Sequence, residues 1–170
     1  MTTGRGQINA MMINNGLVDA NVSGSTLVLQ TNAKTNNGMM GASNNATLSI
    51  FVDVDGSGGW TADDGTIVLQ SGTQVTTTGP VAIGEDDFVQ MLASNNELTG
   101  FDLTIADTGR FSANGSVALS GRLDLRSTDE ADFTSPPAID GRPCQGFGDA
   151  NMQHSCGSGV KTRICLHAQP

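Results

Sequence analysis

Residues 46–70 read ATLSIFVDVDGSGGWTADDGTIVLQ, an apolar run, an acidic glycine-rich crossing and a second apolar run. Side chains of an extended strand alternate between two faces, so the first run predicts a strand with one apolar face, and only Phe51 joins the other face. The crossing begins with Asp55-Gly56, which favours a turn, and the second run is rich in β-branched residues. We therefore predict a β-hairpin with a long, ordered loop. The apolar face of its first strand consists of Leu48, Ile50, Val52 and Val54.

The composition bounds the class of protein. With 170 residues, 37% of them hydrophobic, the chain is long enough for one domain with a buried core. It has 22 glycines, no tyrosine and few strong helix formers, so we expect a mostly β fold. A net charge of −9 opposes general affinity for nucleic acid or anionic lipid, because both require a positive field. No apolar run approaches the roughly 20 residues needed to cross a bilayer, so the chain as given should be soluble.

The order of elements predicts an α+β fold, mostly β. Residues 6–20 predict a short amphipathic helix, because their apolar residues lie three, four or six positions apart. The segments that follow read as strands of antiparallel sheets, and no solenoid period is visible. We expect a single domain with the end of a helix at 1–22, a β-domain at 25–126 and a cysteine-containing C-terminal region at 127–170. The apolar residues of the expected helix are Ile8, Met11, Met12, Leu17 and Val18.

This order, together with several short motifs, resembles the GspH/FimT family of type IV pilin-like proteins, which are minor pilins and minor pseudopilins. In that family an aromatic-apolar-Asp strand precedes a Gly/Asp-rich turn, an acidic residue and an apolar strand. Residues 7–29 look like the end of a stem helix, truncated after its transmembrane part, that leads into the first strand of the β-domain. The matching segments are Ile50–Gly56, Asp63–Gly65, Ile67–Leu69, Phe101–Leu103 with Thr108–Arg110, and Arg163–Leu166.

The resemblance implies a non-enzymatic subunit of a type IV pilus or of a type II secretion pseudopilus. Such a subunit is anchored in the inner membrane by its N-terminal helix before assembly, faces the bacterial periplasm or the cell surface, and has other pilin or pseudopilin subunits as partners. Some members bind DNA through a Gly-Arg-x-Arg motif, but residues 121–126 (GRLDLR) have an extra spacing and an acid, so DNA binding is not expected. The alternative is a calcium-dependent extracellular β-sandwich binding module or adhesin.

The acidic crossing is a candidate calcium loop. Its oxygen-bearing residues follow the alternating spacing of an EF-hand loop, with a glycine at the sixth position and an acid at the twelfth. Trp60 and the short terminal Asp depart from that pattern, so a metal-free acidic turn is the other reading. Apart from calcium we expect no cofactor. The candidate ligands are Asp53, Asp55, Ser57 and Asp64, with Gly58 at the turn.

The three cysteines, Cys144, Cys156 and Cys165, lie within the last 27 residues. Clustered cysteines in a loop-rich segment favour a disulfide and an oxidising compartment, and the sequence leaves the pairing open. A zinc site with His154 and His167 is the alternative, although the spacing matches no usual structural pattern. We find no catalytic motif, and an enzyme is not expected.

Overall fold

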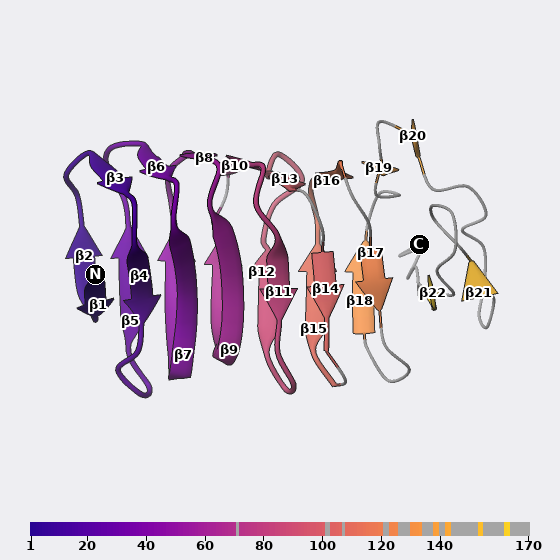
Figure 1. The fold of residues 1–170 in the computed structure, drawn as a ribbon, viewed down its shortest axis with the longest axis horizontal. Helices are drawn as coiled ribbons and strands as arrows, with labels where there is room; N and C mark the ends of the chain where they lie inside the picture. The colour runs from indigo at the N-terminus through magenta and orange to yellow at the C-terminus, as the bar shows by residue number, and fades with distance from the viewer. Residues whose placement is uncertain are drawn as a thin grey trace.

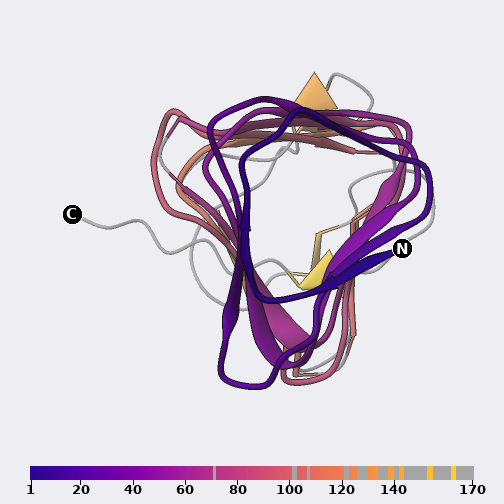
Figure 2. The same ribbon diagram turned by 90° about the vertical axis from the view of Figure 1, so that its left-hand side faces the viewer.

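The computed structural model describes residues 1–70, 72–100, 103–106 and 108–120, and beyond them only the backbone of short strands between residues 123 and 163. The chain winds through successive rungs, each lying parallel on the one before, and so forms a β-solenoid (Figure 1). Viewed along the winding axis, the rungs superpose on a three-sided outline (Figure 2). The described residues contain no helix, and therefore none that could span a membrane.

Each side of the outline is a strip of parallel strands, one from each rung. The first strip contains β1 (Thr2–Gly4), β4 (Leu17–Ala20), the first half of β7 (Met39–Ile50), the first half of β9 (Gly59–Leu69), β11 (Val81–Ile83), β14 (Leu103–Ile105) and β17 (Leu123–Leu125). The second strip contains β2 (Gly6–Ile8), β5 (Thr26–Leu29), the second halves of β7 and β9, β12 (Phe88–Met91), β15 (Arg110–Ala113) and β18 (Glu130–Phe133).

The third strip contains β3 (Met12–Asn14), β6 (Lys34–Asn36), β8 (Val54–Gly56), β10 (Gln74–Thr77), β13 (Glu97–Gly100), β16 (Ser116–Leu119) and β19 (Ala138–Ile139). Two short antiparallel pairs follow. β19 pairs with β20 (Arg142–Pro143), and β21 (Gln153–His154) pairs with β22 (Thr162–Arg163).

The core lies inside the coil, where equivalent positions of successive rungs stack. Positions paired between parallel strands are 19–23 residues apart, except between β1 and β4, where Thr2 pairs with Val18. Alternation along each strand sends every second side chain inward, so that each strip contributes apolar ladders to the interior. Burial of each such side chain stabilises the fold by roughly 1.5–3 kcal/mol. One inward ladder of the second strip is Leu27, Leu48, Ile67, Val89 and Phe111, all buried.

The corner between the first and second strips is built from residues in the left-handed region. β7 and β9 run through this corner, and their register shifts between Ser43 and Ala46. Asn and Asp tolerate positive φ better than most residues, which suits them to a bend repeated at every rung. Residues with positive φ at this corner are Asn44 (54°), Asn45 (53°), Asp64 (61°), Asp86 (60°) and Thr108 (69°).

A stack of glycines leads into the first strip, because neighbouring rungs approach closely there. A Cβ atom on Gly38 would lie 2.1 Å from the carbonyl oxygen of Gly16, and one on Gly58 would lie 2.3 Å from that of Gly38. Beside the stack, Asn14 Nδ2 donates to Asn36 Oδ1 (2.8 Å), and Asn36 Nδ2 donates to the carbonyl oxygen of Gly59 (3.0 Å). These buried amides link three rungs through hydrogen bonds.

The predicted hairpin at 46–70 is wrong in its pairing. Its two apolar runs do pair, but in parallel, with Leu48 opposite Ile67. The residues between them form β8 and the whole third side of a rung, and therefore do more than reverse the chain. Of the predicted apolar face, Leu48, Ile50 and Val54 are buried, whereas Val52 is partly buried.

The α+β, pilin-like prediction is also wrong. Residues 6–20, expected to be a stem helix, form β2, β3 and β4, and the sheets expected to be antiparallel are almost entirely parallel. The helical spacing of the apolar residues is a coincidence of three short strands and the turns between them, and Gly6 has a φ of 112°, outside the helical region. Without a stem helix, the resemblance to the GspH/FimT family and the assignment as a minor pilin or pseudopilin are not supported.

Candidate binding face

The structure separates Asp64 from the other three residues predicted to bind calcium. Asp53, Asp55 and Ser57 lie in or beside β8 on the third strip, whereas Asp64 lies in β9 at the corner between the other two strips. Asp53 Oδ1 instead accepts a hydrogen bond from the backbone N–H of Gln74 (3.0 Å). The described residues contain no group of three His, Cys, Asp or Glu side chains that could hold a metal ion. The candidate cysteines Cys144, Cys156 and Cys165 lie outside the described residues, as does His167.

Acidic side chains instead gather along the corner between the first and second strips. We call this set, Asp63, Asp64, Glu85, Asp86 and Asp87, the acidic corner. All are exposed except Asp87, which is buried.

Asp87 holds two rungs of the acidic corner together. Its Oδ2 accepts a hydrogen bond from the N–H of Asp64 (2.9 Å), and its Oδ1 accepts one from the N–H of Gly65 (2.5 Å). Burial raises the pKa of Asp87, and the two backbone hydrogen bonds act against that rise. The carboxylate is therefore occupied with closing the corner, which gives it a structural role.

The outer surface of the second strip differs from the acidic corner beside it. Over the rungs of β5, β7, β9 and β12, every outward position carries an uncharged side chain. We call this surface the uncharged face. Its residues are Thr26, Val28 and Gln30, then Thr47, Ser49 and Phe51, then Thr66, Val68 and Gln70, then Phe88, Gln90 and Leu92.

The uncharged face is ordered by the same register as the core beneath it. Thr26, Thr47 and Thr66 are successive partners in one ladder, next to a second ladder of Val28, Ser49 and Val68. Hydrogen bonds between side chains run along the axis, as where Gln70 Nε2 donates to Ser49 Oγ (2.9 Å) and Gln30 Nε2 donates to Gln7 Oε1 (3.0 Å). The face is consequently a regular surface with both amide and hydroxyl groups.

A third outer ladder contains exposed apolar groups. Each residue of this ladder directly follows a strand. Its backbone N–H donates a hydrogen bond to the carbonyl oxygen of the last residue of the equivalent strand in the preceding rung. The ladder consists of Gln30, Phe51, Gln70 and Leu92. The Phe51 side chain is 51% exposed and Leu92 is 41% exposed. An exposed large apolar side chain on one strand is common, but two in one ladder between amides form a candidate contact surface.

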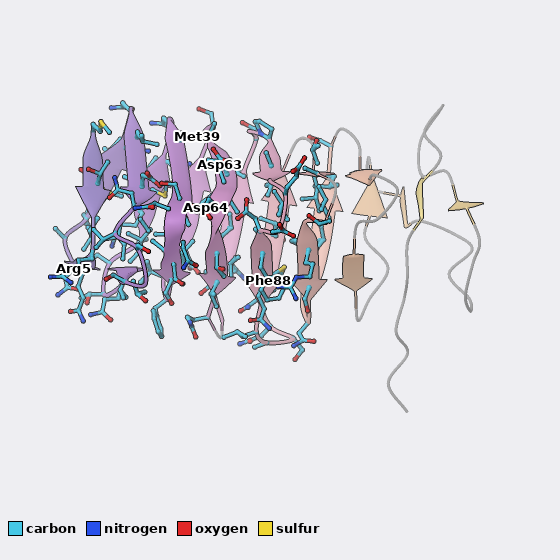
Figure 3. The ribbon with its side chains drawn as sticks, turned by 90° about the horizontal axis from the view of Figure 1, so that it is seen from below. Arg5, Met39, Asp63, Asp64 and Phe88 are labelled. Carbon is cyan, nitrogen blue, oxygen red and sulfur yellow. The ribbon has the colours of Figure 1, made fainter. Side chains whose placement is uncertain are left out.

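Arginines mark the two ends of the uncharged face. Gly6 pairs with Leu27, so the preceding residue, Arg5, lies at the start of the ladder that contains Thr26. At the other end of the same ladder, Arg110 pairs with Phe88. The Arg110 guanidinium lies 5.1 Å from the centre of the Phe88 ring, a cation–π distance. Figure 3 looks onto the acidic corner, with Asp63 and Asp64 between Met39 on one side and Arg5 and Phe88 on the other.

Sequence reasoning missed this face, although the chain carries a signal for it. The segments Thr26–Gln30 (TLVLQ), Thr47–Phe51 (TLSIF) and Thr66–Gln70 (TIVLQ) repeat one pattern at intervals of 21 and 19 residues. Such a repeat is typical of stacked structural units. If the three segments stack in register, their outward positions carry Thr in one ladder and Val or Ser in the next. The repeat then predicts an uncharged surface.

No protein-family model matches the chain, and no curated protein or solved structure shows significant similarity to it.

Proposed function

We propose that this chain is a non-enzymatic binding module that acts outside the cytoplasm and binds its partner through the uncharged face. The three clustered cysteines support the oxidising location, because such clusters are characteristic of proteins outside the reducing cytosol. The adhesin-like role anticipated as an alternative is retained here, whereas its β-sandwich scaffold and its calcium loop are not.

The observation that carries the proposal is the distribution of charge. The chain has 17 Asp and Glu residues against 8 Lys and Arg residues, yet four successive rungs of one outer surface contain no ionisable side chain. Charged residues are common at surfaces that only have to remain soluble, and they are depleted at the centre of binding surfaces. The uncharged face therefore has the composition of a contact surface.

The scaffold supports the same role. The outward side chains of the first two ladders lie on strands whose inward neighbours are buried, such as Leu48 and Ile67, and those of the third ladder directly follow these strands. Groups held on rigid strands lose little conformational entropy on binding, so they contribute more to affinity than groups on loops.

A pair of matched variants tests the proposal. Thr66→Glu adds a charge to the uncharged face, in the ladder next to the acidic corner, and Thr76→Glu adds the same charge to an outward, exposed position on the third strip. We expect fluorescently labelled wild-type protein to bind a subset of a panel of intact bacterial cells in flow cytometry. Binding should fall by at least about tenfold in Thr66→Glu, because a buried unpaired charge is costly, and should be retained in Thr76→Glu.

Two results would overturn the proposal. One is absence of binding across the panel, and the other is an equal loss in both variants. Circular dichroism and thermal unfolding of both variants establish that any loss occurs in folded protein.

A further inference from the structure

We propose that the partner of the uncharged face is a neutral linear polysaccharide, which lies along the solenoid axis across the rungs. This inference rests on the proposed function and names the chemistry of the partner.

Charge complementarity selects a neutral partner. An anionic polymer would be repelled by a chain of net charge −9, and most strongly by the acidic corner that borders the face. A cationic partner would be attracted to that corner rather than to the neighbouring face. The face itself offers neither sign of charge between Arg5 and Arg110, so the partner that it matches has none.

The side chains of the face match the two kinds of surface that a sugar presents. Sugar rings have apolar C–H faces, which pack on aromatic rings, and the half-exposed Phe51 offers such a ring. Sugar hydroxyls both donate and accept hydrogen bonds, as do the carboxamides of Gln30 and Gln70 on either side of Phe51. The described contacts use one N–H of each carboxamide, so each can make further hydrogen bonds.

The geometry favours a linear polymer. Equivalent side chains recur at every rung, about 4.8 Å apart, so hydroxyl, amide and apolar groups form lines parallel to the axis. Along one such line Phe51 and Leu92 are two rungs apart, with Gln70 between them. A chain of repeated sugar units can contact successive equivalents in this line, and each added unit increases affinity.

The size of the face argues against a second copy of the protein as the occupant. Four rungs and five residues of strand cover roughly 15 Å by 15 Å, or about 230 Å² on each copy. A stable interface between proteins buries about 800 Å² on each partner.

Affinity electrophoresis of the intact chain tests the inference. The probes are dextran, a mixed-linkage β-glucan, a galactomannan and, as an anionic polymer, alginate, each cast into a native gel. We expect at least one neutral polymer to retard the protein and alginate to leave its migration unchanged. Phe51→Ala should raise the apparent Kd for that polymer at least about tenfold. Ile13→Ala, which removes a 69% exposed apolar side chain from the third strip, should not change it.

Failure of this inference is distinguishable from failure of the proposed function. If labelled protein binds cells in a Thr66-dependent manner but no neutral polymer retards it, the polysaccharide inference is wrong and the binding module stands. If Phe51→Ala and Ile13→Ala raise the apparent Kd for the polymer equally, the polysaccharide does not bind at the uncharged face, and the inference is also wrong. Sedimentation velocity tests the alternative occupant. If wild type forms concentration-dependent dimers and Thr66→Glu does not, the partner of the face is a second copy of the chain and not a polysaccharide.

Discussion

Lys34 is a lysine at a position where the solenoid otherwise places apolar side chains. Its ladder partners are Met12 and Val54, which are partly buried and buried, and Lys34 itself is 1% exposed. Its Nζ donates hydrogen bonds to the carbonyl oxygens of Gln30 (3.1 Å) and Asn32, and so closes the turn between the second and third strips. Burial lowers the pKa of Lys34 from its usual 10.5, because an ammonium group loses hydration in the interior.

The lowered pKa of Lys34 predicts how stability depends on alkaline pH. The unfolded chain holds the proton up to about its usual pKa of 10.5, whereas the folded chain releases it at lower pH. The unfolded state then binds more protons, so the contribution of Lys34 to stability should rise between these two pKa values. We expect the free energy of unfolding of wild type, relative to Lys34→Met, to increase as pH rises toward 10.5, measured by urea denaturation.

A wild-type stability that falls relative to Lys34→Met over the same range would contradict this assignment. It would mean that the hydrogen bonds of the charged ammonium outweigh its loss of hydration. The free energies compare two folded variants under the same conditions, so general alkaline effects on the chain cancel.

At the scale of elements, the glycine stack provides a prediction with an internal control. Gly38→Ala should destabilise the protein by at least about 3 kcal/mol, because its Cβ would lie 2.1 Å from the backbone oxygen of Gly16 and backbone must shift. Gly16→Ala changes the equivalent position one rung earlier, where the nearest atom is 3.9 Å away, and should change stability by less than about 0.5 kcal/mol. Thermal or chemical unfolding measures both. Similar costs for the two variants would contradict the close stacking of these rungs.

The individual strands could be predicted from sequence, but their pairing could not. Alternation correctly places Leu48 and Ile50 in the core and Phe51 outside, because a strand needs only its own period of two. Alternation does not distinguish an antiparallel neighbour from a parallel one. The composition of the crossing at 55–59 suits both a hairpin turn and a corner of a parallel rung. The parallel arrangement required comparing segments about 20 residues apart, where TLVLQ, TLSIF and TIVLQ align.

The candidate site was missed for a related reason. Carboxylates such as those of Asp53 and Asp64 are recognisable in a sequence as candidate metal ligands, but the fold places these two residues on different sides of a rung. The uncharged face is formed by residues that carry no such chemistry, and it exists only after stacking brings Thr26, Thr47 and Thr66 into one ladder. Its signal is therefore the repeat rather than any single motif.

At the scale of the whole molecule, the solenoid is nearly one-dimensional, because each rung of the described strands β1 to β19 pairs only with the rungs before and after it. Among the described strands, β1, β2 and β3 pair on one side only, whereas β7 pairs with β4 and β5 on one side and β9 on the other. Opening the first rung breaks one set of hydrogen bonds, while opening a central rung breaks two.

Amide hydrogen exchange should consequently follow a gradient along the axis. We expect exchange measured by mass spectrometry to be fastest in peptides covering β1 to β3 and slowest in those covering β7 and β9, because local opening requires less free energy where fewer neighbours are lost. Gly38→Ala, which strains the join between the rungs of β4 and β7, should accelerate exchange in β4 and β5 more than in β12. Uniform protection from β1 to β12 would instead show that the stack opens as one cooperative unit, with coupling between rungs stronger than the pairing of any one rung.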